Sequence, residues 1–173
     1  MSIRNHIISE VKRRIVDESI PRIRKCLSLL TENEIWYKHN DHVNSPGVLV
    51  LHLCGNVRQW ILSGALGMPD ERNRDAEFTS VQYPDRAKLI ESLDILTKDL
   101  LVHLPDLQKC DLLQVRKVQC YEETILSILI HVTEHFSYHT GQIIYYTKWI
   151  KNVDTGFYAG QDLTRKDSND SPD

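Results

Sequence analysis

Residues 122–151, EETILSILIHVTEHFSYHTGQIIYYTKWIK, decide the fold that we expect for this chain. Apolar residues recur there every three to four positions, and neither glycine nor proline interrupts the run before Gly141. This spacing is typical of an amphipathic α-helix, and 30 residues in that form extend for about 45 Å. A helix of this length needs other helices to cover its apolar face, so we expect a helical bundle.

Three further segments with helical spacing supply those partners. The first contains Pro21, which should kink or divide it, and Asn44 or Ser45 should cap the second, with Pro46 in its first turn. Pro105 closes the third. The first two segments cover about residues 3–30 and 45–66, and the third lies between Pro84 and Pro105.

The connections complete an all-α architecture. Residues 70–78 form a long charged loop after the second helix, and residues 107–120 form an irregular connection before the fourth, in which a strand at Val115–Val118 is not favoured. We therefore predict a four-helix bundle over residues 1–155, followed by a polar tail over residues 156–173.

Composition excludes several classes of protein. Hydrophobic residues make up 41% of the 173 residues, which is typical of a globular protein, and the formal net charge of −3 supplies no cationic surface for nucleic acid. The sequence shows no signal peptide and no membrane-spanning run. The four cysteines, Cys26, Cys54, Cys110 and Cys120, lack the spacing of a zinc knuckle or a disulfide scaffold, so we expect free thiols and a cytoplasmic location.

The eight histidines are the unusual feature of this composition. His131, His135 and His139 are each four residues apart and so share one face of the fourth helix. His135 and His139 lie within its apolar arc, whereas His131 lies at the edge. The remaining histidines outside the second helix, His6, His39, His42 and His103, are expected in loops or at helix ends, exposed to solvent.

The second helix carries a histidine of its own. His52 shares a face with Asn56, and Gln142 shares the face of His135, so both helices present a polar stripe to one interior pocket. Three histidines with an open fourth position describe a catalytic Zn²⁺ or Ni²⁺ site. We predict His52, His135 and His139 as ligands, with Asn56 and Gln142 orienting ligands or substrate. His131 could replace His135, and the alternative is that these histidines merely form hydrogen bonds within the core.

The motifs His52-Leu-Cys-Gly-Asn56 and His131-x-x-x-His135-x-x-x-His139-Thr-Gly-Gln142 resemble those of the DinB/YfiT-like superfamily, in a branch of unassigned function. The resemblance extends to about Lys151. It implies a four-helix bundle with a divalent metal, and it maps the histidines of the family's motifs onto His52, His135 and His139. Thr140 stands where many relatives have Arg, which removes a contact for an anion.

The resemblance also implies two kinds of chemistry, since some relatives are thiol-dependent transferases and others carry a hydrolase label. We therefore expect a metal-dependent enzyme that activates water or a low-molecular-weight thiol toward a small-molecule substrate. The alternative is a noncatalytic metal-binding or stress-related interaction protein. Arg72, Arg74, Asp75 and Glu77 either border the mouth of the site or form an exposed charge cluster. An apolar strip of Leu126, Ile130 and Ile144 packs against either a neighbouring helix or a second subunit, and we predict a homodimer.

Overall fold

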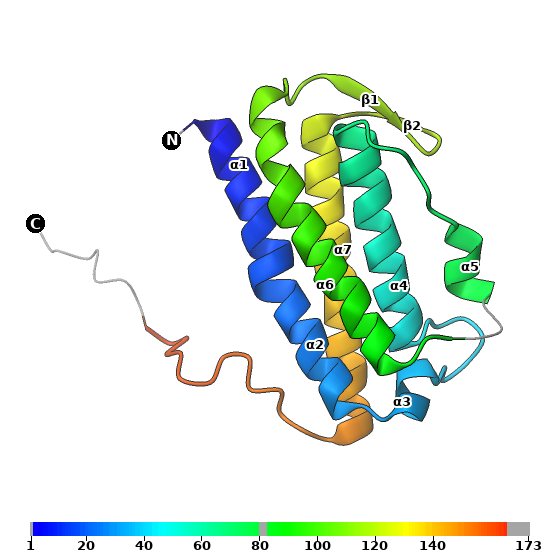
Figure 1. Ribbon diagram of the computed structural model, residues 1–173. Coiled ribbons are helices and arrows are strands. Elements are labelled where there is room, and N and C mark those ends of the chain that lie inside the picture. The colour runs from blue at the N-terminus through cyan, green and yellow to red at the C-terminus, as the bar shows by residue number, and fades with distance from the viewer. Residues whose placement is uncertain (1, 80–82, 166–173) are drawn as a thin grey trace, which may run out of the picture.

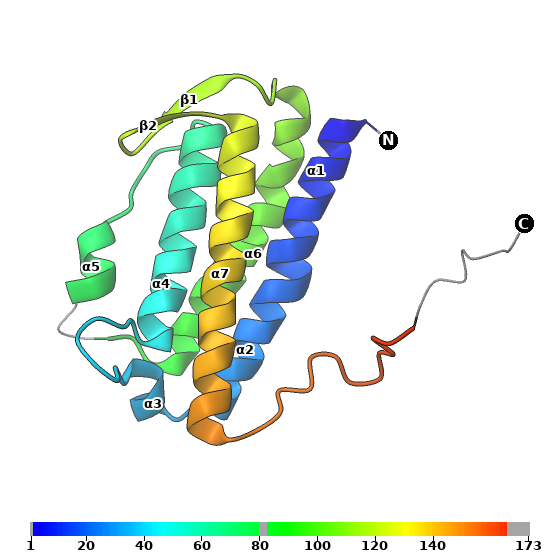
Figure 2. The same ribbon diagram turned by 180° about the vertical axis from the view of Figure 1, so that it is seen from behind.

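The computed structural model describes residues 2–79 and 83–165, which are predominantly helical with one two-stranded sheet. The long helices run side by side, and the sheet lies at one end of them (Figures 1 and 2). These helices are α1 (Ile3–Lys12) with α2 (Ile20–Leu29), α4 (Pro46–Val57), α6 (Arg86–His103) and α7 (Ile125–Lys151).

The first helical segment, for which a kink or a division at Pro21 was expected, is not divided there. A π-helical stretch, Arg13–Ser19, joins α1 to α2, and within it the backbone N–H of Ile20 bonds to the carbonyl of Ile15. Pro21 has no N–H to donate, so it can stand at the point where bonding returns from the i+5 to the i+4 pattern. The wider π-helical turn accommodates Pro21, so the helix continues through this position.

The start of the second long helix is confirmed at Ser45. The Ser45 hydroxyl accepts a hydrogen bond from the backbone N–H of Val48, and Pro46 occupies the first turn of α4. A π-helical stretch, Arg58–Ala65, extends this helix. Nearly every residue of α4 is buried, because α6 and α7 pack against it and a short helix, α3 (Glu32–Trp36), covers its start.

Two connections contain structure that the sequence analysis did not predict. Residues 70–78 include a short helix, α5 (Arg74–Thr79), which lies outside α4 (Figure 1). After α6 and a 3-10 turn, Leu104–Lys109, the strands β1 (Val115–Val118) and β2 (Tyr121–Thr124) form an antiparallel hairpin.

The hairpin corrects two predictions. A strand at Val115–Val118 was not favoured, yet that segment pairs with β2, and α7 begins at Ile125, not at about Glu122. The Thr124 hydroxyl accepts from the backbone N–H of Ser127, so Thr124 caps the helix and ends the strand. Each strand has four residues, too few for alternation to stand out in the sequence.

Other predictions concern the surface and the C-terminal region. Phe157, within the predicted tail, is half-buried against the core, and residues 166–173 lie outside the described part. In the apolar strip for which a homodimer was predicted, Ile130 is exposed, whereas Leu126 and Ile144 are half-buried.

Within the described ranges, no helix has both the length and the apolar character needed to span a membrane.

Candidate metal centre

Three histidine side chains converge between α4 and α7. His52 lies on α4, and His135 and His139 lie one turn apart on α7. Nε2 of His135 is 3.1 Å from Nε2 of His52 and 3.2 Å from Nε2 of His139. One ligand atom from each ring lies within 4.8 Å of the others, so this group could hold a metal ion.

Hydrogen bonds at the opposite ring nitrogens orient two of these histidines. Nδ1 of His52 lies 3.1 Å from Oε2 of Glu77, and Nδ1 of His139 lies 2.7 Å from Oε1 of Gln142. An amide oxygen can only accept, so Nδ1 of His139 carries the proton and its Nε2 keeps its lone pair. The lone pair of His139 therefore points at His135. At His52, Nη2 of Arg72, a donor, lies as close to Nδ1 as the Glu77 carboxylate does, at 3.1 Å. Three imidazole nitrogens this close together are a donor set that fits a metal ion.

The electrostatic surroundings favour neutral imidazoles. Burial, followed by the adjacent His139 and His52, lowers the pKa of His135 to about 3. Burial also lowers the pKa of His139, although its hydrogen bond to Gln142 acts in the opposite direction. Both rings are thus neutral at pH 7, which is the form that coordinates metals.

The Glu77 carboxylate is itself held by a buried arginine. Nε of Arg72 donates to Oε1 of Glu77 at 2.7 Å, and Nη2 donates to Oε2 at 2.8 Å. The two side chains are only 3% and 10% exposed. Burial raises the pKa of Glu77, but hydrogen bonds from Arg72 and His52 outweigh it and leave the pKa below its ordinary value. Glu77 therefore stays ionised and can accept from His52.

A glycine on α4 makes room for this ion pair. A Cβ added at Gly55 would lie 2.1 Å from Oε1 of Glu77 and 2.8 Å from Nε of Arg72. The carboxylate can therefore pack against α4 only where the side chain is absent. Gln59, one turn further on, accepts from Arg72 at 2.8 Å and donates to Asp70 at 2.8 Å, which ties the loop to the helix.

The loop contributes more to the site than the sequence analysis predicted. Arg74 and Asp75 are exposed, as residues bordering a mouth should be, but Arg72 and Glu77 reach inward to His52, each at 3.1 Å from its Nδ1. Glu77 has no distinguishing neighbours in its charged run. The usable signal was Gly55, a glycine inside an apolar helix one turn after His52, because such a glycine indicates close approach of another group.

Two predicted accessory residues lie beside the group, not in contact with its ligand nitrogens. The ring of His131 packs on Trp60, with centroids 4.0 Å apart, and His131 is not among the three grouped histidines. The Asn56 carboxamide is buried, and its Oδ1 has no hydrogen-bond partner in the described part of the chain. Glu77 holds the position next to His52 that was expected for Asn56.

A polar cavity of about 420 Å³ opens onto one side of the group, between α4, the hairpin and α7. His52, His135, Asn56 and Trp60 line it. Nδ1 of His135 and Nε1 of Trp60 are buried and, like Oδ1 of Asn56, have no partner among the described residues. Buried polar atoms are usually paired, so these three are exceptions within the walls of the cavity.

The positions outside the group give a mixed result. Thr140 is buried, and its hydroxyl donates to the carbonyl of Phe136 one turn earlier in α7. Its hydroxyl is therefore turned to the backbone of its own helix, and it is not available to an anion at the metal centre. His6 and His42 are exposed, as expected. The ring of His39 is also exposed but packs edge-on against Trp149, with centroids 5.3 Å apart.

A known protein family matches most of this chain. A family model described as "Protein of unknown function (DUF1572)" matches residues 3–157, which include the three histidines, Gly55 and Glu77. A comparison with curated proteins finds none that matches the chain. Because the family model covers well over half of the 173 residues, the chain belongs to the DUF1572 family, whose function is unknown.

Proposed function

We propose that this protein is a DinB-like four-helix bundle that binds one divalent ion, Zn²⁺ or Ni²⁺, through Nε2 of His52, His135 and His139. We further propose that it is an enzyme, either a thiol S-transferase or a hydrolase. The observation that carries the proposal is the approach of the three Nε2 atoms, with that of His135 at 3.1 and 3.2 Å from those of His52 and His139.

The chain's own residues prepare this site before any ligand binds. Gln142 holds the proton on Nδ1 of His139, the Glu77 carboxylate lies against Nδ1 of His52, and Arg72 keeps Glu77 ionised. Such partners of ligand histidines fix the ring orientation and raise the affinity for metal. Three protein ligands leave a coordination position free, which is typical of catalytic sites.

A divalent ion held there lowers the pKa of a coordinating water or thiol toward neutrality and so supplies a nucleophile. The polar cavity, with a volume of about 420 Å³, borders His52 and His135 and has room for this water or thiol. Asn56 and Trp60 line this cavity, and each has a buried polar atom without a partner among the described residues. The site therefore suits a small polar co-reactant.

Metal content tests the binding proposal. Protein purified without added metal is analysed by inductively coupled plasma mass spectrometry, then reloaded with Zn²⁺ or Ni²⁺ against a chromogenic chelator. We expect close to one ion per chain in the wild type, and loss of it in His52→Ala and His139→Ala. The control His6→Ala removes an exposed histidine of α1 and should retain the ion. Equal metal in all four proteins would contradict the site.

Turnover by the loaded protein tests the catalytic proposal. Consumption of an electrophile that requires an added thiol indicates a transferase, and release of product from activated esters in water alone indicates a hydrolase. Stoichiometric metal without turnover in a broad screen of both would overturn the enzyme proposal. It would instead support the noncatalytic alternative, in which the ion stabilises the bundle.

A further inference from the structure

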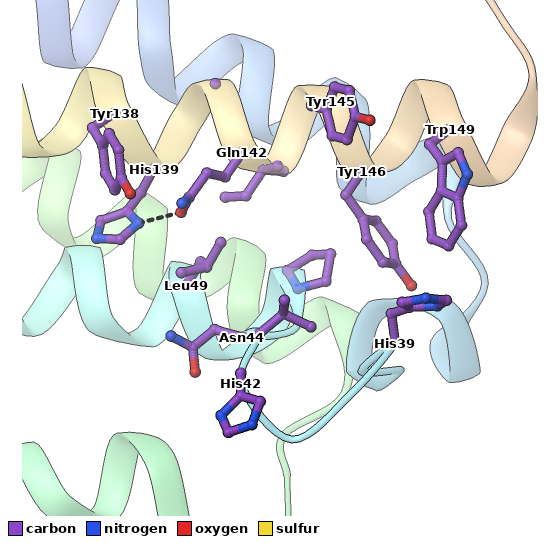
Figure 3. Close-up of a pocket in the computed structure, with 14 residues that line it drawn as sticks. His39, His42, Asn44, Leu49, Tyr138, His139, Gln142, Tyr145, Tyr146 and Trp149 are labelled. Atoms are coloured by element: carbon purple, nitrogen blue, oxygen red, sulfur yellow. Dashed lines mark hydrogen bonds between the residues drawn. The ribbon is translucent and has the colours of Figure 1, made fainter.

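A second cavity reaches the three histidines from another side. It is a cleft of about 900 Å³ between α7 and the segment that leads into α4, and we call it the aromatic cleft. Tyr138, Tyr146 and Trp149 form its α7 wall, and His39, His42 and Leu49 lie across from them (Figure 3). Its volume lies within the range of small-molecule sites.

His139, a proposed metal ligand, lies at one end of the aromatic cleft. The ring of His139 lines the cleft, while Nε2 of the same ring is 3.2 Å from His135. Gln142 also lines the cleft, and its Oε1 bonds to His139, which leaves its amide N–H groups for a ligand (Figure 3). A molecule in the cleft can therefore place one end beside the metal centre.

The lining indicates the chemistry of the occupant. Among the described residues that line the cleft, none is Asp, Glu, Lys or Arg, whereas the polar cavity on the other side includes Arg72, Arg74 and Glu123. A cleft without charges cannot compensate the desolvation of a charged ligand. Tyr138 and Trp149 are 62% and 52% exposed, so rings are available for stacking or edge contacts.

The aromatic rings of the cleft already support one another. Trp149 contacts His39 edge-on and lies 6.2 Å from Tyr146 between ring centroids. The Tyr146 hydroxyl donates to the carbonyl of Glu34 at 2.7 Å, which fixes that ring from behind. The wall is therefore formed before a ligand arrives, and less ordering is needed on binding.

Gly141 adds an independent indication. It is the single glycine of α7, where glycine costs about 0.5 to 1 kcal/mol relative to alanine. No neighbour requires it, since a Cβ added there meets no atom within 4 Å. Gly141 lines the aromatic cleft one turn from both Tyr138 and Tyr145, so a side chain at this position would extend over the same surface.

We propose that the aromatic cleft binds the uncharged, flat apolar part of the substrate, with its reacting group beside His139. This deepens the proposed function, on which it rests for the reaction, and names the substrate class as a neutral aromatic or similarly planar apolar molecule. The polar co-reactant occupies the opposite cavity, so the two reactants approach the centre from different sides.

A matched pair of probes tests the proposal. Binding of neutral 2-naphthamide and anionic 2-naphthoate is measured by isothermal titration calorimetry on metal-free and metal-loaded protein. We expect saturable binding of the amide at one site per chain, at least about tenfold tighter than the carboxylate in the metal-free protein. Absence of saturable amide binding, or equal binding of the carboxylate there, would overturn the proposal.

Variants locate the probe. Trp149→Ala and Gly141→Leu should each weaken amide binding about tenfold or more, one by removing a ring and the other by filling space. Tyr158→Ala removes a ring that is 53% exposed outside the cleft and should leave binding unchanged. Wild-type affinity in both cleft variants would contradict the assigned location.

The same titration separates the two proposals. His52→Ala should lose the metal yet still bind the amide, because His52 does not line the aromatic cleft. If neither the wild type nor any variant holds metal but the amide still binds at the cleft, the metal proposal fails and the cleft assignment stands. If metal binds as expected and the amide does not, the cleft assignment fails alone.

Discussion

The change Gly55→Ala tests how the structure couples the loop to the metal centre. A methyl group at this position would lie 2.1 Å from Oε1 of Glu77 and 2.8 Å from Nε of Arg72. Real contacts of this kind need at least about 3.0 Å, so the carboxylate must retreat by about 1 Å. The 3.1 Å contact between Glu77 and Nδ1 of His52 then exceeds hydrogen-bonding distance.

The magnitude follows from the lost partner of His52. Removing a hydrogen-bond partner of a ligand histidine lowers metal affinity by roughly 10- to 100-fold, which is about 1.4 to 2.8 kcal/mol. The fold itself should survive, because the atoms displaced belong to side chains, and alanine improves helix propensity by about 0.5 to 1 kcal/mol. The expected variant is thus folded and weak in metal binding.

The assay is competition for Zn²⁺ against a chromogenic chelator at pH 7, with circular dichroism as the check on folding. Gly141→Ala is the matched control, since it makes the same chemical change in α7, where the new methyl group meets nothing within 4 Å. The control should keep wild-type metal affinity. Wild-type affinity in Gly55→Ala as well would refute the role assigned to Glu77.

Other regions give further predictions. Hydrogen bonds from Lys151 and Thr31 lower the pKa of Glu34 from 4.5 to about 2, so its contribution to stability is present above pH 4.5 and lost as pH falls toward 2; Glu34→Gln should flatten that part of the acid-unfolding curve, and an unchanged curve would contradict it. Burial raises the pKa of Cys54 to about 12, so a thiol reagent should modify exposed Cys120 in the native protein and Cys54 only after denaturation. Gly47→Ala would place a methyl group 2.4 Å from the Trp36 ring and should lower the free energy of unfolding in urea by about 1 to 3 kcal/mol; no loss would mean that Trp36 moves freely. The apolar strip containing exposed Ile130 predicts a homodimer, which light scattering at micromolar concentration should show as twice the mass of one chain, and a monomer mass would contradict it.

Helical periodicity made most of the fold predictable. Long runs such as residues 125–151 have a strong repeat, and a serine before proline marked the start of α4 at Ser45. The hairpin was missed because strands of four residues carry little periodic signal and Thr124 serves both the strand and the helix cap. The short helix α3 begins with a capping box of Thr31 and Glu34, a local motif that the sequence analysis did not use. In α5, Glu77 is held by contacts with Arg72 and His52 that no local pattern displays.

The residues of the candidate site were also predictable from the sequence only in part. His52, His135 and His139 were predictable because helical geometry alone places His135 beside His139 and turns His52 toward the interior. Glu77 was not, because its position depends on an ion pair with Arg72 and on the space left by Gly55. The aromatic cleft depends on how residues 39–49 pack across from α7, which no local pattern specifies.

X-ray absorption spectroscopy of the zinc-loaded protein tests the central claim most directly, because it reports the ligands of the ion itself. The structure predicts a first shell of nitrogen and oxygen atoms at about 2.0 to 2.1 Å, with the outer-shell scattering of three imidazole rings. Loss of one ring in His135→Ala should reduce that scattering to two. A sulfur ligand at about 2.3 Å, or a spectrum that His135→Ala leaves unchanged, would contradict a centre built from His52, His135 and His139.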